Sequence, residues 1–242
     1  MNKDALQRRY ELREMFNARW IVRAGAPWRL LPNDFPPWEL VYQQTQRWIR
    51  AGCFEAMVSD VRSILRVAQD RRGQPSAVIL DGRTLRSTCE SGARAGYEGD
   101  KRKKGSKVHM AVDTLGQLLA VHVTPANEQE RAQVGELARQ VQQATAQTVK
   151  LAFADQGYTG EEPAQAALDE GIDFRSSSCR RRKKASCCCH AAGWLSGASA
   201  GSTASADRQE TTSNCPETLA GLHFVVFSVL VLVHFATLSK SA

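Results

Sequence analysis

The order of the predicted elements indicates an α/β protein in which a mixed sheet follows a small helical unit. Two apolar runs, Ala77–Leu80 and Val149–Ala154, predict buried strands, and each run ends in an acid, Asp81 or Asp155. Short apolar runs bounded by turn residues are typical of such strands. Helical patterns separate the later strands, so the predicted order after residue 75 is strand, strand, strand, helix, strand, helix, strand.

Residues 1–70 predict the helical unit, because apolar residues recur at helical spacing in three segments. These segments are residues 1–24, Trp38–Ile49 and Phe54–Val67. The short link Ala51–Gly52, with Arg47 and Arg50 beside it, fits a helix-turn-helix DNA-binding unit. A helical subdomain that packs on the sheet explains the same pattern, and the sequence leaves both interpretations open.

Residues 75–174 predict the sheet and the helices that cover it. After the first strand, Val108–Asp113 and Leu118–Val123 predict an antiparallel hairpin, because a four-residue connection joins them. We interpret Asp113, at the start of this turn, as a hairpin cap. The remaining predicted elements are helices at residues 128–144 and 161–170 and a strand that begins at Ile172.

A long polar loop is predicted at residues 83–107, and it ends in a basic run. The basic residues of this run are Lys101, Arg102, Lys103, Lys104 and Lys107. Many such runs are solvated surfaces, but this one lies between two predicted strands, where a phosphate backbone could be held. The net charge of +7 also favours a polyanionic partner. Residues 1–174 contribute only +2 of this charge, so the loop matters more than the total.

Asp81 and Asp155 are expected to lie side by side at the ends of neighbouring strands and to share a divalent cation. Carboxylates are the hard oxygen ligands that Mg²⁺ prefers, and Mn²⁺ is a substitute. With a basic loop nearby, such a pair fits metal-assisted phosphoryl transfer. By itself the pair is a weak indication, because strand-end acids occur in α/β proteins of many functions.

The last third of the chain changes character twice. Residues 176–215 contain two large apolar residues, Trp194 and Leu195, and therefore predict a disordered segment. Residues 216–242 are strongly apolar, and Leu219–Leu238 is long enough to span a bilayer. Two histidines within this run, and no basic cluster before it, favour a core helix over a membrane anchor.

Six motifs between about residue 8 and residue 174 carry a family resemblance. They are Gly25–Trp38 with its Trp-Arg-Leu-Leu-Pro centre, Ile79–Thr84, Lys104–His109, Val112–Gly116, Thr124–Asn127 and Ala154–Tyr158. In these motifs the chain resembles bacterial insertion-sequence transposases of the DDE class, in the IS five-like group. The resemblance implies an RNase H-like mixed sheet with flanking helices, in which two aspartates and one glutamate bind two magnesium ions.

Matched residue by residue, the resemblance makes Asp81 the first acid and Asp155 the second. Lys104, Lys107 and His109 match a basic stretch, so the expected DNA contacts are this histidine together with the five residues of the basic run. The implied reaction is strand cleavage at the element's ends by water, followed by attack of the freed 3′-hydroxyl on target DNA. The implied partners are the terminal repeats, target DNA and further copies of the chain. A charged N-terminus without a signal peptide predicts a cytoplasmic, nucleoid-associated bacterial protein with no membrane contact.

The third acid of the family is missing from this sequence. In the family it lies in a helix that reads roughly Trp-Val-Val-Glu-Arg, and no such sequence is present, although Pro216–Leu222 resumes the family pattern. Permitted codons for Ala192–Ser196, read in the adjacent frame, give Trp-Val-Val-Glu. We therefore hypothesise that residues from about 175 to 215 are translated out of frame. A chain without this glutamate is expected to be inactive in transposition, and the alternative role is a non-catalytic DNA-binding remnant that competes for element ends.

Overall fold

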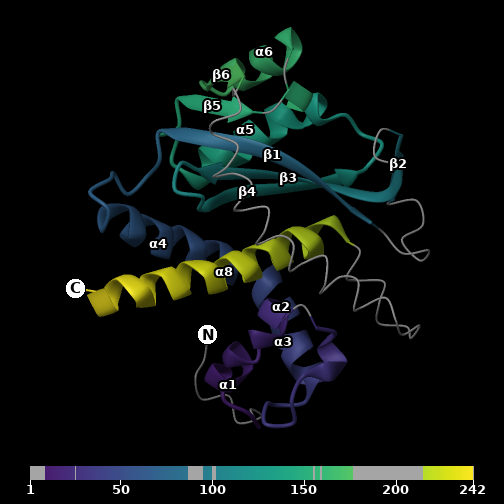
Figure 1. Ribbon diagram of the computed structural model, residues 1–242, viewed down its shortest axis with the longest axis vertical. Helices are drawn as coiled ribbons and strands as arrows, with labels where there is room; N and C mark the ends of the chain where they lie inside the picture. Colours follow the sequence, from purple (N-terminus) through teal and green to yellow (C-terminus); the bar gives the residue numbers. More distant parts are fainter. Residues whose placement is uncertain are drawn as a thin grey trace.

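The computed structural model describes residues 9–24, 26–86, 95–99, 102–154, 156–158, 160–176 and 215–241. In this part of the chain a mixed sheet has helices on both faces, and a helical unit lies beyond one of the two helical layers (Figure 1). The predicted α/β class is therefore confirmed. Residues 177–214, which carry the out-of-frame hypothesis, lie outside the described ranges.

Six described strands form the sheet, and their pairing is partly antiparallel and partly parallel. The strands are β1 (Ala77–Arg86), β2 (Gly96–Glu98), β3 (Lys103–Asp113), β4 (Leu118–Pro125), β5 (Leu151–Ala154) and β6 (Asp173–Ser176). β3 pairs antiparallel with β1, β2 and β4, whereas β5 pairs parallel with both β1 and β6. Three antiparallel strands are thus followed by two parallel strands that are reached through helices, which is the RNase H-like arrangement that the resemblance implied.

The predicted loop at residues 83–107 is wrong over much of its length. β1 continues to Arg86, and β3 begins at Lys103, so that Thr84 pairs with Lys107 and Arg86 pairs with Gly105. Hydropathy did not indicate these strand extensions, because Leu85 is the one large apolar side chain that they bury, and Thr84 and Lys107 are buried against the polar Glu98. The predicted hairpin between β3 and β4 is confirmed.

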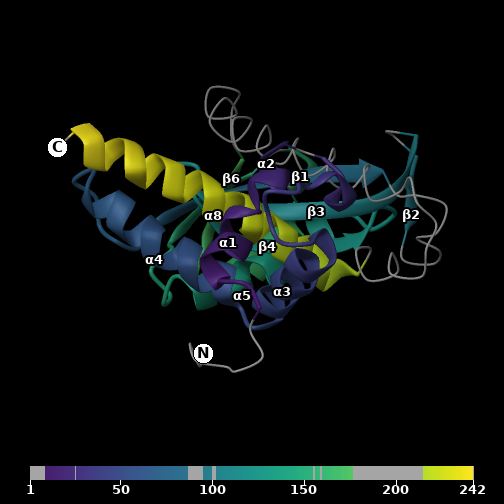
Figure 2. The same ribbon diagram turned by 90° about the horizontal axis from the view of Figure 1, so that it is seen from below.

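Alternate residues of the sheet belong to two separate hydrophobic cores. Val78, Leu80 and Ala111 face α5 (Val134–Ala144) and α6 (Glu161–Asp169). Ile79, Met110 and Val112 belong to the core on the opposite face, which is covered by α4 (Cys53–Val67) and α8 (Pro216–Ser241). α4 and α8 run alongside each other in both views (Figure 1, Figure 2).

The first predicted helix is divided in the structure. It forms α1 (Leu12–Asn17) and α2 (Trp20–Ala24), and the 3-10 helix η1 (Trp28–Leu30) follows before α3 (Trp38–Arg50). Arg19 lies at the break and is buried, with its guanidinium 3.5 Å from the ring centre of Phe16 and 4.8 Å from that of Trp48. Its three nitrogens have no hydrogen-bond partner in the described part of the chain. Cation–π contacts therefore replace hydrogen bonds at this position.

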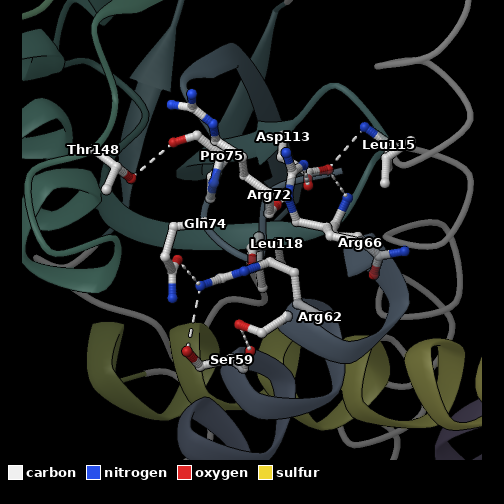
Figure 3. A network of polar contacts seen from close by, with 12 residues as sticks. Ser59, Arg62, Arg66, Arg72, Gln74, Pro75, Asp113, Leu115, Leu118 and Thr148 are labelled. Atoms are coloured by element: carbon white, nitrogen blue, oxygen red, sulfur yellow. Dashed lines mark hydrogen bonds and ion pairs between the residues drawn. The ribbon is translucent and has the colours of Figure 1, made fainter. Parts of the chain in front are cut away.

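α4 belongs to the core of the sheet as much as to the helical unit. Arg62 donates to the carbonyls of Leu118 (3.1 Å) and Ala144 (3.3 Å), and Arg66 pairs with the fully buried Asp113 (Figure 3). Arg66 also donates to the carbonyl of Arg72 at 2.9 Å, so the segment after α4 is held by side chains. These contacts support the interpretation of a helical unit that packs on the sheet.

α8 begins in the core and ends in a more exposed position. His223 and Phe227 are buried, whereas Val233 and Phe235 near the end of the helix are 47% and 41% exposed. By length and composition, the segment Pro216–Ser239 could cross a membrane. Half of its most apolar stretch is buried inside the protein. Its packing against α4, β4 and α3 agrees with the prediction of a core helix.

Candidate active site

Asp81 lies in β1 at the point where the apolar part of the strand ends. It pairs with Met110 of β3, which places it on the sheet face that α4 and α8 cover. The side chain is partly buried, and its Oδ1 accepts the backbone N–H of Gly82 at 2.9 Å. A partly exposed carboxylate on a rigid strand is a suitable ligand for a divalent cation.

The second predicted acid follows β5, which is the parallel neighbour of β1. In the β1–β5 pairing Leu80 lies beside Ala154, the residues that immediately precede Asp81 and Asp155. Asp155 itself lies outside the described residues. Among the residues that are described, no group of three or more histidine, cysteine, aspartate or glutamate side chains is placed to hold a metal ion. The register of β1 and β5 places the two acid motifs beside each other in the sheet.

Lys107, predicted to contact DNA, is buried in a polar cluster on the other face of the sheet. Its ammonium lies 3.5 Å from Glu98 and 3.8 Å from Glu130, and it donates to the carbonyl of Glu128 at 3.1 Å. Glu98 also accepts a hydrogen bond from the hydroxyl of Thr84. A lysine that is 6% exposed and already paired with two carboxylates is not available to phosphate, so this part of the prediction is wrong.

His109 is also buried, and the prediction that it contacts phosphate is wrong for the same reason. Its Nδ1 lies 2.9 Å from the hydroxyl of Tyr158, and its Nε2 lies 3.1 Å from Oγ1 of Thr124. Burial, together with the neighbouring His122 and Lys107, lowers the pKa of His109 to about 3. The imidazole is therefore neutral at physiological pH. The two-residue spacing of Lys107 and His109 within a strand is the sequence signal that could have placed both on one face.

The other members of the basic run lie at the surface. Arg102 and Lys104 are exposed and Lys103 is partly exposed, while Lys101 lies outside the described residues. Lys104 pairs across the strands with Tyr97, whose side chain is 59% exposed. Strand alternation places Lys104 on the same sheet face as Met110 and hence as Asp81. Sequence reasoning did not find Tyr97, because the short strand β2 has no hydrophobic pattern of its own.

The exposed faces of α3 and α4 differ in charge. α3 exposes Arg47 and Arg50, whereas α4 exposes Glu55 and Asp60 and buries its opposite side in the core. An acidic exposed face is unfavourable for a helix that would enter a DNA groove. Between the two helices of the predicted helix-turn-helix, α3 is therefore the one whose surface suits DNA.

Two family models match the chain, and together they cover most of it. Residues 72–187 match the family described as "Transposase DDE domain", and residues 2–58 match "Putative transposase of IS4/5 family". Among solved structures, the chain is similar to Mos1 transposase in a paired-end complex with the left transposon end. The identity is 11% and the TM-score 0.37, with 100% of this chain and 81% of that chain covered. This similarity is too low to support an argument, and no curated protein matches the sequence. From the two family matches, the chain belongs to the insertion-sequence transposases with a DDE domain.

Proposed function

We propose that the chain binds the end sequences of an insertion element and that Asp81 and Asp155 form the metal-binding part of its strand-transfer site. The observation that carries this proposal is the pairing of Leu80 with Ala154, directly before the two acids. The reaction class is hydrolysis of a phosphodiester at the element ends, followed by attack of the freed 3′-hydroxyl on a target phosphodiester, which joins the element end to the target and releases a 3′-hydroxyl of the target strand. A Mg²⁺ or Mn²⁺ ion bound there would supply Lewis-acid stabilisation of the phosphoryl oxygens.

The exposed basic residues are the proposed contacts for the DNA backbone. Arg102, Lys103 and Lys104 lie at the beginning of β3, and by strand alternation Lys104 shares the sheet face of Asp81. Tyr97 beside Lys104 offers an aromatic surface next to the charge. A DNA strand that crosses this part of the sheet would have its phosphates beside these cations and would continue toward Asp81.

We also propose that this chain does not complete transposition, because the third acid of the family is missing from its sequence. Two carboxylates leave the proposed site short of one ligand, and loss of a ligand commonly costs orders of magnitude in rate. The alternative role, a non-catalytic DNA-binding remnant that competes for element ends in the bacterial cytoplasm, follows from the same features. An active relative is expected to work as a homo-oligomer.

DNA binding is tested with a fluorescent duplex that carries the element end found beside the gene. Substitution of Arg102, Lys103 and Lys104 by Gln should weaken binding and should reduce the slope of log K against log salt by about 0.9 for each phosphate that the variant no longer neutralises. The matched control substitutes Gln at three exposed basic positions elsewhere, Arg139, Lys150 and Arg175. Equal binding by both triple variants would overturn the proposed surface.

Catalysis is tested with the same duplex in the presence of Mg²⁺ or Mn²⁺. The expected result is binding without nicked or strand-transfer products. Robust cleavage that disappears in the Asp81→Asn variant would overturn the proposed inactivity and would support the metal site. Cleavage that persists in the Asp81→Asn variant would overturn the metal site itself.

A further inference from the structure

Each acid motif contains a glycine whose missing side chain makes room for a buried polar group. Gly82 follows Asp81, and a Cβ atom built on Gly82 would lie less than 3.0 Å from the hydroxyl of Tyr158. A Cβ atom on Gly157, which lies two positions after Asp155, would come equally close to the carboxylate of Glu130. Neither glycine has a positive φ. Both are therefore required by close approach of another group and not by a turn.

The hydroxyl of Tyr158 connects the segment after β5 to the two strands beside Asp81. Tyr158 ends the 3-10 helix η4 (Gln156–Tyr158), its side chain is 1% exposed, and its hydroxyl lies against Gly82 of β1. The same hydroxyl is hydrogen-bonded to Nδ1 of His109 in β3 at 2.9 Å, with the two rings edge to face at 5.9 Å. Gly82 and His109 are direct partners in the β1–β3 pairing. We call the contact among Gly82, His109 and Tyr158 the tyrosine bridge.

Both ring nitrogens of His109 take part in hydrogen bonds. A neutral imidazole has one N–H donor and one acceptor nitrogen, and the hydroxyls of Tyr158 and Thr124 occupy both. The fully buried ring therefore has a hydrogen-bond partner on each side, one of which is the Tyr158 hydroxyl. Both hydroxyl groups bond to the same imidazole, but only Tyr158 belongs to the segment that follows the second acid.

A second contact holds η4 from the other side. The carboxylate of Glu130, in the 3-10 helix η3 (Glu130–Gln133), lies against Gly157 and is 3.8 Å from the ammonium of Lys107. Lys107 is in turn fixed by Glu98 and by the carbonyl of Glu128. η4 thus lies between a buried hydrogen bond on one side and a partly buried ion pair on the other.

These contacts lie where strand pairing ends. The pairing of β1 with β5 runs from Ala77 and Leu151 to Leu80 and Ala154, so it stops immediately before both acids. Two carboxylates that share a metal site must keep their relative positions to within about half an ångström. Beyond Leu80 and Ala154, the tyrosine bridge continues the connection between the two chain segments.

We propose that Tyr158 is a positioning residue, whose hydroxyl, packed on Gly82 and bonded to His109, fixes the segment after β5 relative to Asp81. This role rests on the proposed function of Asp81 and Asp155 as ligands of a divalent cation. It explains why a glycine follows Asp81 and why a histidine is buried in β3 among charged neighbours. It also gives Gly82, His109 and Tyr158 a role that DNA contact does not require.

The first test measures Mn²⁺ binding to the full chain by electron paramagnetic resonance. Tyr158→Phe, which removes only the hydroxyl, should weaken Mn²⁺ binding about tenfold. The matched control, Thr124→Val, removes the hydroxyl on the other side of the same imidazole and should leave the affinity within about twofold. Equal affinities for Tyr158→Phe and wild type would overturn the positioning role, and so would equal losses in both variants, because a general effect on the buried histidine would explain them.

The second test measures thermal midpoints without metal. Gly82→Ala should lower the midpoint by several degrees, because its methyl group meets the Tyr158 hydroxyl, and it should have a much smaller effect in the Tyr158→Phe background. Purely additive effects would overturn the bridge. Asp81→Asn separates this inference from the proposed function. If wild type binds no Mn²⁺, or if Asp81→Asn binds it normally, the proposed metal site and the positioning role are both wrong. The thermal midpoints of Gly82→Ala in wild type and in Tyr158→Phe still test whether the tyrosine bridge exists.

Discussion

Breaking the buried ion pair between Arg66 and Asp113 should be one of the most destabilising single changes in this chain. Asp113 is fully buried, and its Oδ1 accepts the backbone N–H groups of Leu115 at 2.9 Å and Gln117 at 2.8 Å. Its Oδ2 pairs with Arg66, whose side chain is 6% exposed (Figure 3). The predicted hairpin cap is thus confirmed, and the same carboxylate also attaches α4 to the sheet.

The test substitution is Asp113→Asn, which keeps an oxygen for the two backbone donors and removes the charge. Arg66 would then be buried without a counter-charge, and breaking a buried pair in this way costs about 3–5 kcal/mol. Arg62 would also be affected, because Asp113 favours the charged form of that buried guanidinium, whose pKa is lowered by burial. Since whole domains are stable by only about 5–15 kcal/mol, the variant should lose a large fraction of its stability.

Urea unfolding followed by circular dichroism measures this loss. The matched control is Asp173→Asn, which breaks the exposed pair of Asp173 with Arg175 (2.8 Å, 55% and 64% exposed) and should cost less than about 1 kcal/mol. Equal losses in the two variants would refute the reasoning, because it depends on burial of the first pair. The double variant Arg66→Met with Asp113→Asn should recover part of the loss, since it removes the unpaired charge.

Two further predictions concern α8. The pKa of His223 is lowered to about 4, mainly by burial and to a smaller extent by Arg83. The hydrogen bond from its Nδ1–H to the carbonyl of Leu219 (2.8 Å) opposes this shift. In the unfolded chain the pKa of this histidine is near 6.5, so the unfolded state takes up the proton first as the pH falls. The free energy of unfolding should therefore keep its full value above about pH 6.5 and fall by about 3 kcal/mol toward pH 4. Urea unfolding of His223→Met should show a correspondingly flatter pH dependence. Gly221→Val should destabilise the chain by about 1–3 kcal/mol, because even a Cβ atom there would lie less than 3.0 Å from Ile49 of α3. An unchanged thermal midpoint would contradict the packing of α8 on α3.

The sequence predicted correctly those parts of the fold in which the buried residues are apolar. Ala77–Leu80 and the hairpin residues are apolar, so hydropathy placed them correctly in strands. The extension of β1 to Arg86 was missed, because Thr84 is buried against Glu98, and two polar groups that satisfy each other leave no hydrophobic pattern. The divided first helix was missed for a related reason, since Arg19 is enclosed by aromatic rings at the break.

The structure separates the members of the predicted DNA-contacting set into exposed and buried side chains. A basic run predicts a surface that binds phosphate when its side chains are treated as equivalent. Strand alternation places these side chains on opposite faces of the sheet. Lys104 is exposed, whereas Lys107 and His109 are buried on the other face. Which face is buried depends on Glu98 and Glu130, and these residues lie on other elements. A single sequence does not indicate such pairings.

The position of these contacts in the sequence indicates what loss of the third acid would change. The contacts described above that hold Asp81 in place include those from β1, β3 and the segment that ends at Tyr158. These contacts precede residue 175, and therefore the region proposed to be out of frame. Such a change would remove a ligand without removing the structure that positions the other two. A chain of this kind is expected to keep its strand register, its tyrosine bridge and its basic surface, and so to bind element ends that it does not cut.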